Sequence, residues 1–127
     1  MPHLHIDYCG TLDAHSDMQQ LCARLARTLV QMEDDGGHAI FPLNGTRVLA
    51  YPAPHHAVAD GAPDKVFVYL NLRITAGRSA ALVERVGRTL LAQVDAHFAP
   101  LSGKLPVRVT LHIDEGHPIY EGKWASA

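Results

Sequence analysis

The sequence predicts an α/β (α+β) fold in which two strand-helix-strand repeats form one sheet that two helices cover on one face. Residues 18–32 and 82–98 carry apolar residues at helical spacing, and each stretch is flanked by segments in which apolar and polar residues alternate. The element order is therefore strand, helix, strand, twice over. A helix that joins two strands implies parallel pairing with a right-handed crossover, so each half is predicted to be a βαβ unit.

The first predicted strand begins on Pro2, directly after Met1, and its apolar and polar residues alternate. Proline is tolerated at the first residue of a strand because it has no N–H to donate, and this is the ordinary interpretation of Pro2. If Met1 is removed, the chain begins with a secondary amine at the end of a strand. An α-amino group titrates near pH 8 (roughly 7.7–8.0), so Pro2 is also a candidate catalytic base.

The first predicted helix follows a turn at residues 10–13. Ser16-x-x-Gln19 has the form of a capping box and predicts Ser16 as the N-cap of this helix. Gly36 and Gly37 end the segment. The apolar stripe of the helix comprises Met18, Leu21, Cys22, Leu25, Leu29 and Met32. Residues 38–45 are more apolar than a solvent-exposed loop favours, so we expect other parts of the protein to cover them.

A short strand is predicted at about residues 46–51, where Pro52 and Pro54 end it. Residues 55–64 are polar, contain glycine and proline, and indicate a surface connection. Residues 65–75 alternate cleanly and predict a long strand. One face of this strand carries Val66, Val68, Leu70, Leu72 and Ile74, and the other carries Phe67, Tyr69, Asn71 and Arg73.

The second repeat continues with a turn at residues 76–78 and with Ser79, a plausible N-cap for the second helix, which Pro100 ends. The last long strand has one face made of Leu105, Val107, Val109, Leu111 and Ile113. We therefore predict a single domain over residues 1–127, with repeats at about 2–52 and 65–114. The tail, residues 115–127, is polar but holds Ile119, Tyr120 and Trp124.

Two arrangements share this element order: the ferredoxin-like fold, and one in which two βαβ units lie side by side about a pseudo-twofold axis. The pattern alone does not separate them. In both, two helices cover one face of the sheet and the other face needs cover. Leu49, Phe67 and Tyr69 make that second face apolar enough to predict association with other subunits.

The composition is that of an ordinary globular protein, with 47% hydrophobic and 19% charged residues in 127. A net charge of −2 without a basic run argues against a general binder of nucleic acid or anionic membranes. We find no apolar run near the roughly 20 residues of a membrane span, and no secretory leader pattern. Cys9 and Cys22 form no C-x-x-C pair, which favours free thiols in a reducing compartment, so the cytoplasm is the expected location.

Two arginines are candidate anion ligands. Arg47 lies at the start of the second predicted strand, and Arg78 lies in the turn before the second helix, where Gly77 permits a tight bend. Guanidinium groups bind carboxylates bidentately, so the pair could form a carboxylate site. Because most arginines in proteins are exposed, solvated surface positions remain the alternative for both.

The nine histidines raise the possibility of a metal site, since His3 and His5 share one strand face and His112 could lie opposite them. The H-x-H pattern lacks spaced third and fourth ligands, so we predict no metal and keep a metal-binding module as an alternative. Asp7 and Asp114 are interpreted as partners of neighbouring histidine or arginine, or as solvated carboxylates, rather than as a paired acid and base.

The chain resembles the 5-carboxymethyl-2-hydroxymuconate isomerases of the tautomerase superfamily. The resemblance is carried by Met1-Pro2-His3, by Ile40-Phe41-Pro42-Leu43 with Gly45 and Arg47, and by Gly77-Arg78-Ser79. It implies a homotrimer of tautomerase-like subunits without a cofactor. It also implies Pro2 as the amino-terminal base and Arg47, Arg78 and Phe41 as substrate-binding residues. The histidine-rich first strand departs from the family pattern, which leaves the exact substrate open.

The expected activity is that of a cofactor-independent isomerase, an intramolecular oxidoreductase that transposes double bonds. It would convert the dienol 5-carboxymethyl-2-hydroxymuconate, a small polycarboxylate, to the conjugated 2-oxo isomer in aromatic (homoprotocatechuate) catabolism. Two alternatives stay open: a ferredoxin-like module that binds a metal or another ligand through His3, His5 and His112, and an oligomeric superfamily member without activity.

Overall fold

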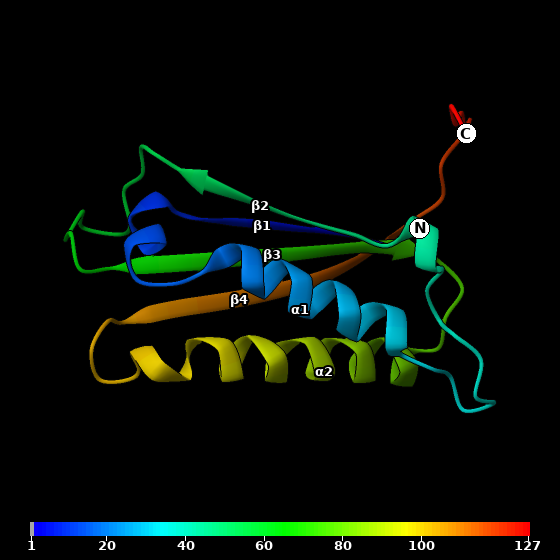
Figure 1. Cartoon of the computed structure of the whole chain (residues 1–127), viewed down its shortest axis with the longest axis horizontal. Coiled ribbons are helices and arrows are strands. Elements are labelled where there is room, and N and C mark those ends of the chain that lie inside the picture. The colour runs from blue at the N-terminus through cyan, green and yellow to red at the C-terminus, as the bar shows by residue number, and fades with distance from the viewer. Residues whose placement is uncertain (1) are drawn as a thin grey trace.

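The computed structural model describes residues 2–127 and arranges four strands in one sheet with two long helices packed against it (Figure 1). In chain order the elements are β1 (His3–Cys9), a 3-10 helix (Gly10–Ala14), α1 (Met18–Gln31), a 3-10 helix (Leu43–Gly45), β2 (Arg47–Ala53), β3 (Val66–Thr75), α2 (Ala80–Phe98), a 3-10 helix (Ala99–Leu101) and β4 (Val107–Gly116). None of the helices in this part of the chain is long and apolar enough to cross a membrane.

The strand order in the sheet is β2-β1-β3-β4. β1 pairs with β2 in parallel, β3 pairs with β4 in parallel, and the two pairs meet through the antiparallel β1–β3 ladder. Each helix thus joins two adjacent strands, which confirms the two predicted βαβ units. A split βαβ arrangement would place another strand between β1 and β2, so the adjacency selects the side-by-side alternative over the ferredoxin-like one.

Both helices cover the same face of the sheet, and the core lies between them and the strands (Figure 1). Alternation along β1 places Leu4 and Ile6 in this core, and the same rule buries every second residue of β3. The helices contribute their apolar stripes: Met18, Leu21, Leu25 and Leu29 from α1, and Val86, Leu90, Val94 and Phe98 from α2. Each fully buried aliphatic side chain stabilises the fold by about 1.5–3 kcal/mol.

The predicted N-cap of α1 is wrong by one residue. Asp17 caps the helix, and its carboxylate accepts a hydrogen bond from the backbone N–H of Gln20 at 3.0 Å. Ser16 instead contacts His97 near the end of α2, with 2.8 Å between Ser16 Oγ and His97 Nε2. The capping-box motif misled because both Ser16 and Asp17 are good caps, and Ser16 has a partner 81 residues away. The predicted cap of α2 is confirmed, since Ser79 Oγ accepts from the N–H of Leu82.

β2 is longer than predicted, because it continues through Pro52 to Ala53. Pro52 is the register partner of Tyr8 in a strand that lies at the edge of the sheet. An edge strand tolerates proline where the missing N–H would face away from the ladder, so this proline does not end the strand. The apolar loop before β2 is covered only in part: Phe41 is buried, whereas Leu43 is exposed.

No helix among residues 2–127 packs on the second face of the sheet (Figure 1). By alternation and register this face bears Leu49 of β2 and Phe67 and Tyr69 of β3, as predicted, and it also bears Tyr51 of β2. Leu49 and Tyr51 are exposed in the single chain. We call this surface the uncovered face.

Candidate functional site

Pro2 is buried at the point where β1 begins. Its carbonyl oxygen accepts a hydrogen bond at 3.2 Å from the backbone N–H of Arg47, the first residue of β2. The parallel β1–β2 ladder therefore fixes Pro2 beside one of the two predicted arginines. Met1, whose removal would free the Pro2 nitrogen, lies outside the described residues 2–127.

Arg47 reaches the side chain of its register partner His3, with 3.4 Å between Arg47 Nη1 and His3 Nε2. Partial desolvation at the start of the sheet lowers the pKa of His3, and the neighbouring Arg47 guanidinium and His5 lower it further. A lowered pKa favours the neutral imidazole, which can accept a hydrogen bond from the guanidinium. Both side chains are exposed at the end of the sheet.

Arg78 is held in place by backbone groups and by an aromatic ring. Its Nη1 donates to the carbonyl of Thr75 at 2.9 Å, and its Nη2 donates to the carbonyl of Ile40 at 3.2 Å. The guanidinium carbon lies 5.2 Å from the centre of the Phe41 ring, a cation–π distance. Gly77, with φ of 113°, provides the left-handed bend from which Arg78 turns back toward Ile40.

These contacts connect the predicted residues through one loop. Residues 40 and 41 hold Arg78, and the same loop leads to Arg47, which pairs with Pro2. Phe41 is only 2% exposed and its ring faces Arg78. In the single chain its observable role is to support the guanidinium.

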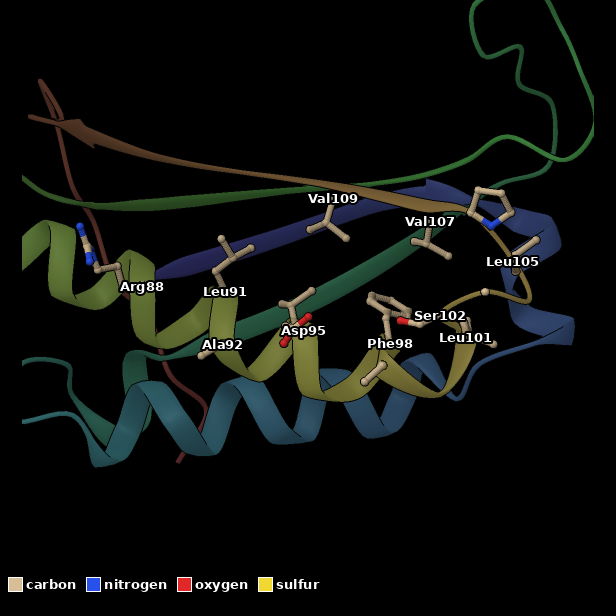
Figure 2. A pocket seen from close by; sticks show the side chains of 14 residues that line it. Arg88, Leu91, Ala92, Asp95, Phe98, Leu101, Ser102, Leu105, Val107 and Val109 are labelled. Carbon is tan, nitrogen blue, oxygen red and sulfur yellow. The ribbon is translucent and has the colours of Figure 1, made fainter.

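A cavity lies elsewhere, between α2 and the start of β4 (Figure 2). It has a volume of about 770 Å³, and Leu91 and Phe98 of α2 face Val107 and Val109 of β4 across it. Its lining includes neither Pro2 nor the two arginines. Pro2, Arg47 and Arg78 instead lie at the opposite end of the sheet, where β1 and β2 begin and β3 ends.

The histidines do not gather into a ligand set. His112 was expected opposite His3 and His5, but β3 separates β1 from β4, and Asn71 lies between His5 and His112 in the register. His112 is instead 3.0 Å, at Nδ1, from the hydroxyl of Tyr69. Within residues 2–127, no three His, Cys, Asp or Glu side chains come close enough to hold a metal ion.

The structure adds a residue that the sequence interpretation did not select. Arg73 of β3 is the antiparallel register partner of His3, so it lies in the same cross-strand row as Arg47. The alternation of β3 assigns Arg73 to the uncovered face. Only the strand order, however, reveals that it lies beside the start of β1.

Comparison with known proteins finds similar sequences and similar folds. A model of the family described as 5-carboxymethyl-2-hydroxymuconate isomerase matches residues 2–126. The curated 5-carboxymethyl-2-hydroxymuconate Delta-isomerase of Escherichia coli is 30% identical over 118 residues, which cover 93% of this chain and 89% of that protein.

Solved structures with the same description are also similar. A 5-carboxymethyl-2-hydroxymuconate delta-isomerase superposes with a TM-score of 0.93 at 44% identity, covering 98% of this chain and 89% of the other. The isomerase from Deinococcus radiodurans R1 gives a TM-score of 0.79 at 30% identity, covering 98% and 88%. A more distant structure, described as a fused 4-OT symmetric trimer, shares the fold with a TM-score of 0.61 at 15% identity, covering 96% and 93%.

Proposed function

The chain belongs to the 5-carboxymethyl-2-hydroxymuconate isomerase family, and we propose that it converts the dienol 5-carboxymethyl-2-hydroxymuconate to its conjugated 2-oxo isomer. It is thus an isomerase that transposes double bonds, with a role in aromatic (homoprotocatechuate) catabolism. The observation that carries the proposal is the family match over residues 2–126 in a chain whose Pro2 is buried and bonded to Arg47.

Pro2 acts as the base once its nitrogen is the free amino terminus. The neutral secondary amine takes the proton of the 2-hydroxyl group, and the electron pair moves through the diene to a distant carbon. The protonated amine then returns the proton to that carbon. One O–H bond is broken and one C–H bond is formed, so the product is an isomer and no further reactant is consumed.

Arg47 and Arg78 bind carboxylates of the substrate and stabilise the negative charge of the dienolate. Two backbone carbonyls and Phe41 already orient Arg78, so little side-chain freedom is lost when an anion binds it. Positive charge near the amine also disfavours its protonated form, which helps to keep the Pro2 nitrogen unprotonated, and so able to accept a proton, at neutral pH.

Self-association as a homotrimer is part of this proposal. The uncovered face exposes Leu49 and Tyr51, and the tail exposes Ile119, Tyr120 and Trp124. These apolar groups need cover, and a distant protein with the same fold is described as a symmetric trimer. The tail leaves from the end of the sheet at which β1 begins, so a neighbouring subunit that covers it would lie close to Pro2.

The cytoplasm is the proposed location. Support for it comes from the two cysteines, which are free thiols, Cys9 being buried and Cys22 half-buried. Free thiols of this kind are typical of a reducing compartment.

The deciding experiment measures ketonisation of 5-carboxymethyl-2-hydroxymuconate by ultraviolet absorbance, with protein whose intact mass shows that Met1 is absent. We expect turnover by the wild type and a decrease of about 100-fold or more in kcat for Pro2→Ala, because a positioned base contributes roughly 10²–10⁴. Pro52→Ala is the matched control, since Pro52 is exposed at the far end of β2, and we expect it to keep wild-type activity.

Unchanged activity in Pro2→Ala would remove Pro2 as the base while leaving the isomerase function in place. Absence of turnover with any 2-hydroxymuconate dienol would remove the isomerase function. The alternatives that would then remain are a ligand-binding module and an oligomeric family member without activity.

A further inference from the structure

The proposed substrate carries more negative charge than the two predicted arginines account for. 5-Carboxymethyl-2-hydroxymuconate has three carboxylates, one at each end of the muconate chain and one on the carboxymethyl group. Arg47 and Arg78 supply two guanidinium groups. Since a buried or constrained carboxylate needs a partner, a third cation is expected at the same end of the sheet.

Arg73 lies at this position. His3 pairs with Arg47 in the parallel ladder and with Arg73 in the antiparallel ladder, so the two arginines flank His3 in one row on the uncovered face. Neighbouring strands lie about 4.8 Å apart, which places the backbones of β2 and β3 about 10 Å apart across β1. The guanidinium of Arg73 lies over Gly116 of β4, on the side of β3 away from β1, so a molecule that contacts both arginines has to extend across β1 and β3.

The guanidinium of Arg73 has no acidic partner among residues 2–127, and the same is true of Arg47: neither forms an ion pair within 4.0 Å. Asp114, the register partner of Arg73 in β4, instead accepts a hydrogen bond from Asn71 at 2.7 Å. The nearest carboxylate in the ladder is thus already engaged, and the exposed Arg73 remains available to a bound anion.

Gly116 makes room for this arginine. A Cβ atom at position 116 would overlap the Arg73 guanidinium, so the side chain of Arg73 lies directly over the Gly116 backbone. Gly116 is not among the glycines with positive φ, so its backbone conformation does not require glycine. Its register partner is Thr75, whose carbonyl holds Arg78. The guanidinium groups of Arg73 and Arg78 therefore both contact the Thr75–Gly116 pair at the end of the sheet.

We propose that Arg73, positioned by Gly116, binds the third carboxylate of the substrate and so determines the preference for a tricarboxylate over a dicarboxylate. This inference rests on the proposed function. It makes Arg73 a specificity-determining residue, and it leaves the proton transfer to Pro2.

The test compares two substrates that differ by the carboxymethyl group, which carries the third carboxylate: 5-carboxymethyl-2-hydroxymuconate and 2-hydroxymuconate. For Arg73→Gln we expect kcat/KM to fall about 10- to 100-fold with the tricarboxylate, as for loss of a charged hydrogen bond, and to change less than about threefold with the dicarboxylate. Arg108→Gln is the matched control, because Arg108 is exposed on the same face at the other end of β4. It should affect neither substrate.

Gly116→Ala provides a second, independent variant. The added methyl displaces the flexible end of Arg73 without removing its charge, so we expect a smaller loss in the same direction and, in combination with Arg73→Gln, no additional loss. A loss that is equal for both substrates, or no loss with the tricarboxylate, overturns the role of Arg73. Failure of the wild type on both substrates overturns the proposed function itself, and the two failures are therefore distinguishable.

Discussion

His97 links the end of α2 to the residue that precedes α1. Its Nε2 lies 2.8 Å from Ser16 Oγ, and its ring packs edge-on against Phe98. Burial lowers the pKa of His97, and the positive charge of Arg24 lowers it further. The folded protein therefore takes up this proton at a lower pH than the unfolded chain, in which a histidine titrates near 6.5.

We expect acidification to destabilise the fold through this histidine. Between the two pKa values the unfolded state binds more protons than the folded state. The contribution of His97 to the free energy of unfolding is therefore at its maximum above pH 6.5 and decreases as the pH drops below that value. The lowered pKa of His3 acts in the same direction. Urea unfolding at pH 7.5 and 5.5 should show a smaller decrease in the free energy of unfolding for His97→Gln than for the wild type. The glutamine amide keeps a hydrogen bond to Ser16 but does not titrate. Equal losses in the two proteins would contradict the assignment.

The residues of the proposed site could be selected from the sequence more readily than the groups that orient them. Pro2, Arg47 and Arg78 stand out because of their type and their place beside predicted turns. The carbonyls of Ile40 and Thr75 that hold Arg78 have no signature in the sequence, because every residue has a carbonyl, and Ile40 lies 38 residues away. Arg73 was overlooked because its place beside His3 depends on the strand order.

At the scale of the elements, two adjacent residues at the start of α1, Ser16 and Asp17, could each cap the helix, and only Asp17 does so. The Asp17 carboxylate accepts from the N–H of Gln20, whereas Ser16 is engaged with His97. An N-cap satisfies a backbone N–H that has no partner within the helix, and an acidic cap also interacts favourably with the positive end of the helix dipole.

Replacing Asp17 by alanine should therefore lower the free energy of unfolding by about 0.5–2 kcal/mol. Chemical denaturation followed by circular dichroism measures this loss. Asp17→Asn is the matched control, because an amide oxygen still caps the helix, and it should recover most of the stability. If Asp17→Ala were as stable as the wild type, the cap would not contribute to stability.

The apolar face of a helix was predicted more accurately than the ends of helices and strands. The apolar stripe of α1 depends on residues three and four apart, which the sequence shows directly, but the helix spans Met18–Gln31 and ends before Gly36 and Gly37, which were predicted to end it. The end of β2 depends on whether Pro52 lies in an edge or a central strand. That property belongs to the sheet and cannot be determined from seven residues.

At the scale of the whole molecule, the strand order could not be derived from the sequence, because both candidate folds bury the same alternating residues. The ladders that decide between them pair residues far apart in the chain, such as His3 with Arg47 and His3 with Arg73. The same arrangement leaves one sheet face and the tail with exposed apolar side chains. Trp124 is 88% exposed and is the single tryptophan of the chain.

Trp124 can therefore report on self-association. We expect sedimentation at micromolar concentration to give three times the chain mass, with Trp124 emission shifted to the blue and protected from acrylamide. Dilution should shift the emission to the red in step with dissociation. Deletion of residues 117–127 should weaken the association, because it removes Ile119, Tyr120 and Trp124. A monomer with freely quenched Trp124 at these concentrations would rule out the trimer.

The antiparallel β1–β3 ladder lies in the middle of the sheet, and residues 54–65, which lead from β2 to β3, belong to none of the four strands. Each half of the chain is thus a complete strand-helix-strand unit. The halves hold together through the central ladder and the packing of α1 on α2, not through the peptide that connects them. We therefore expect two fragments cut within this connection to remain bound to each other through the β1–β3 ladder.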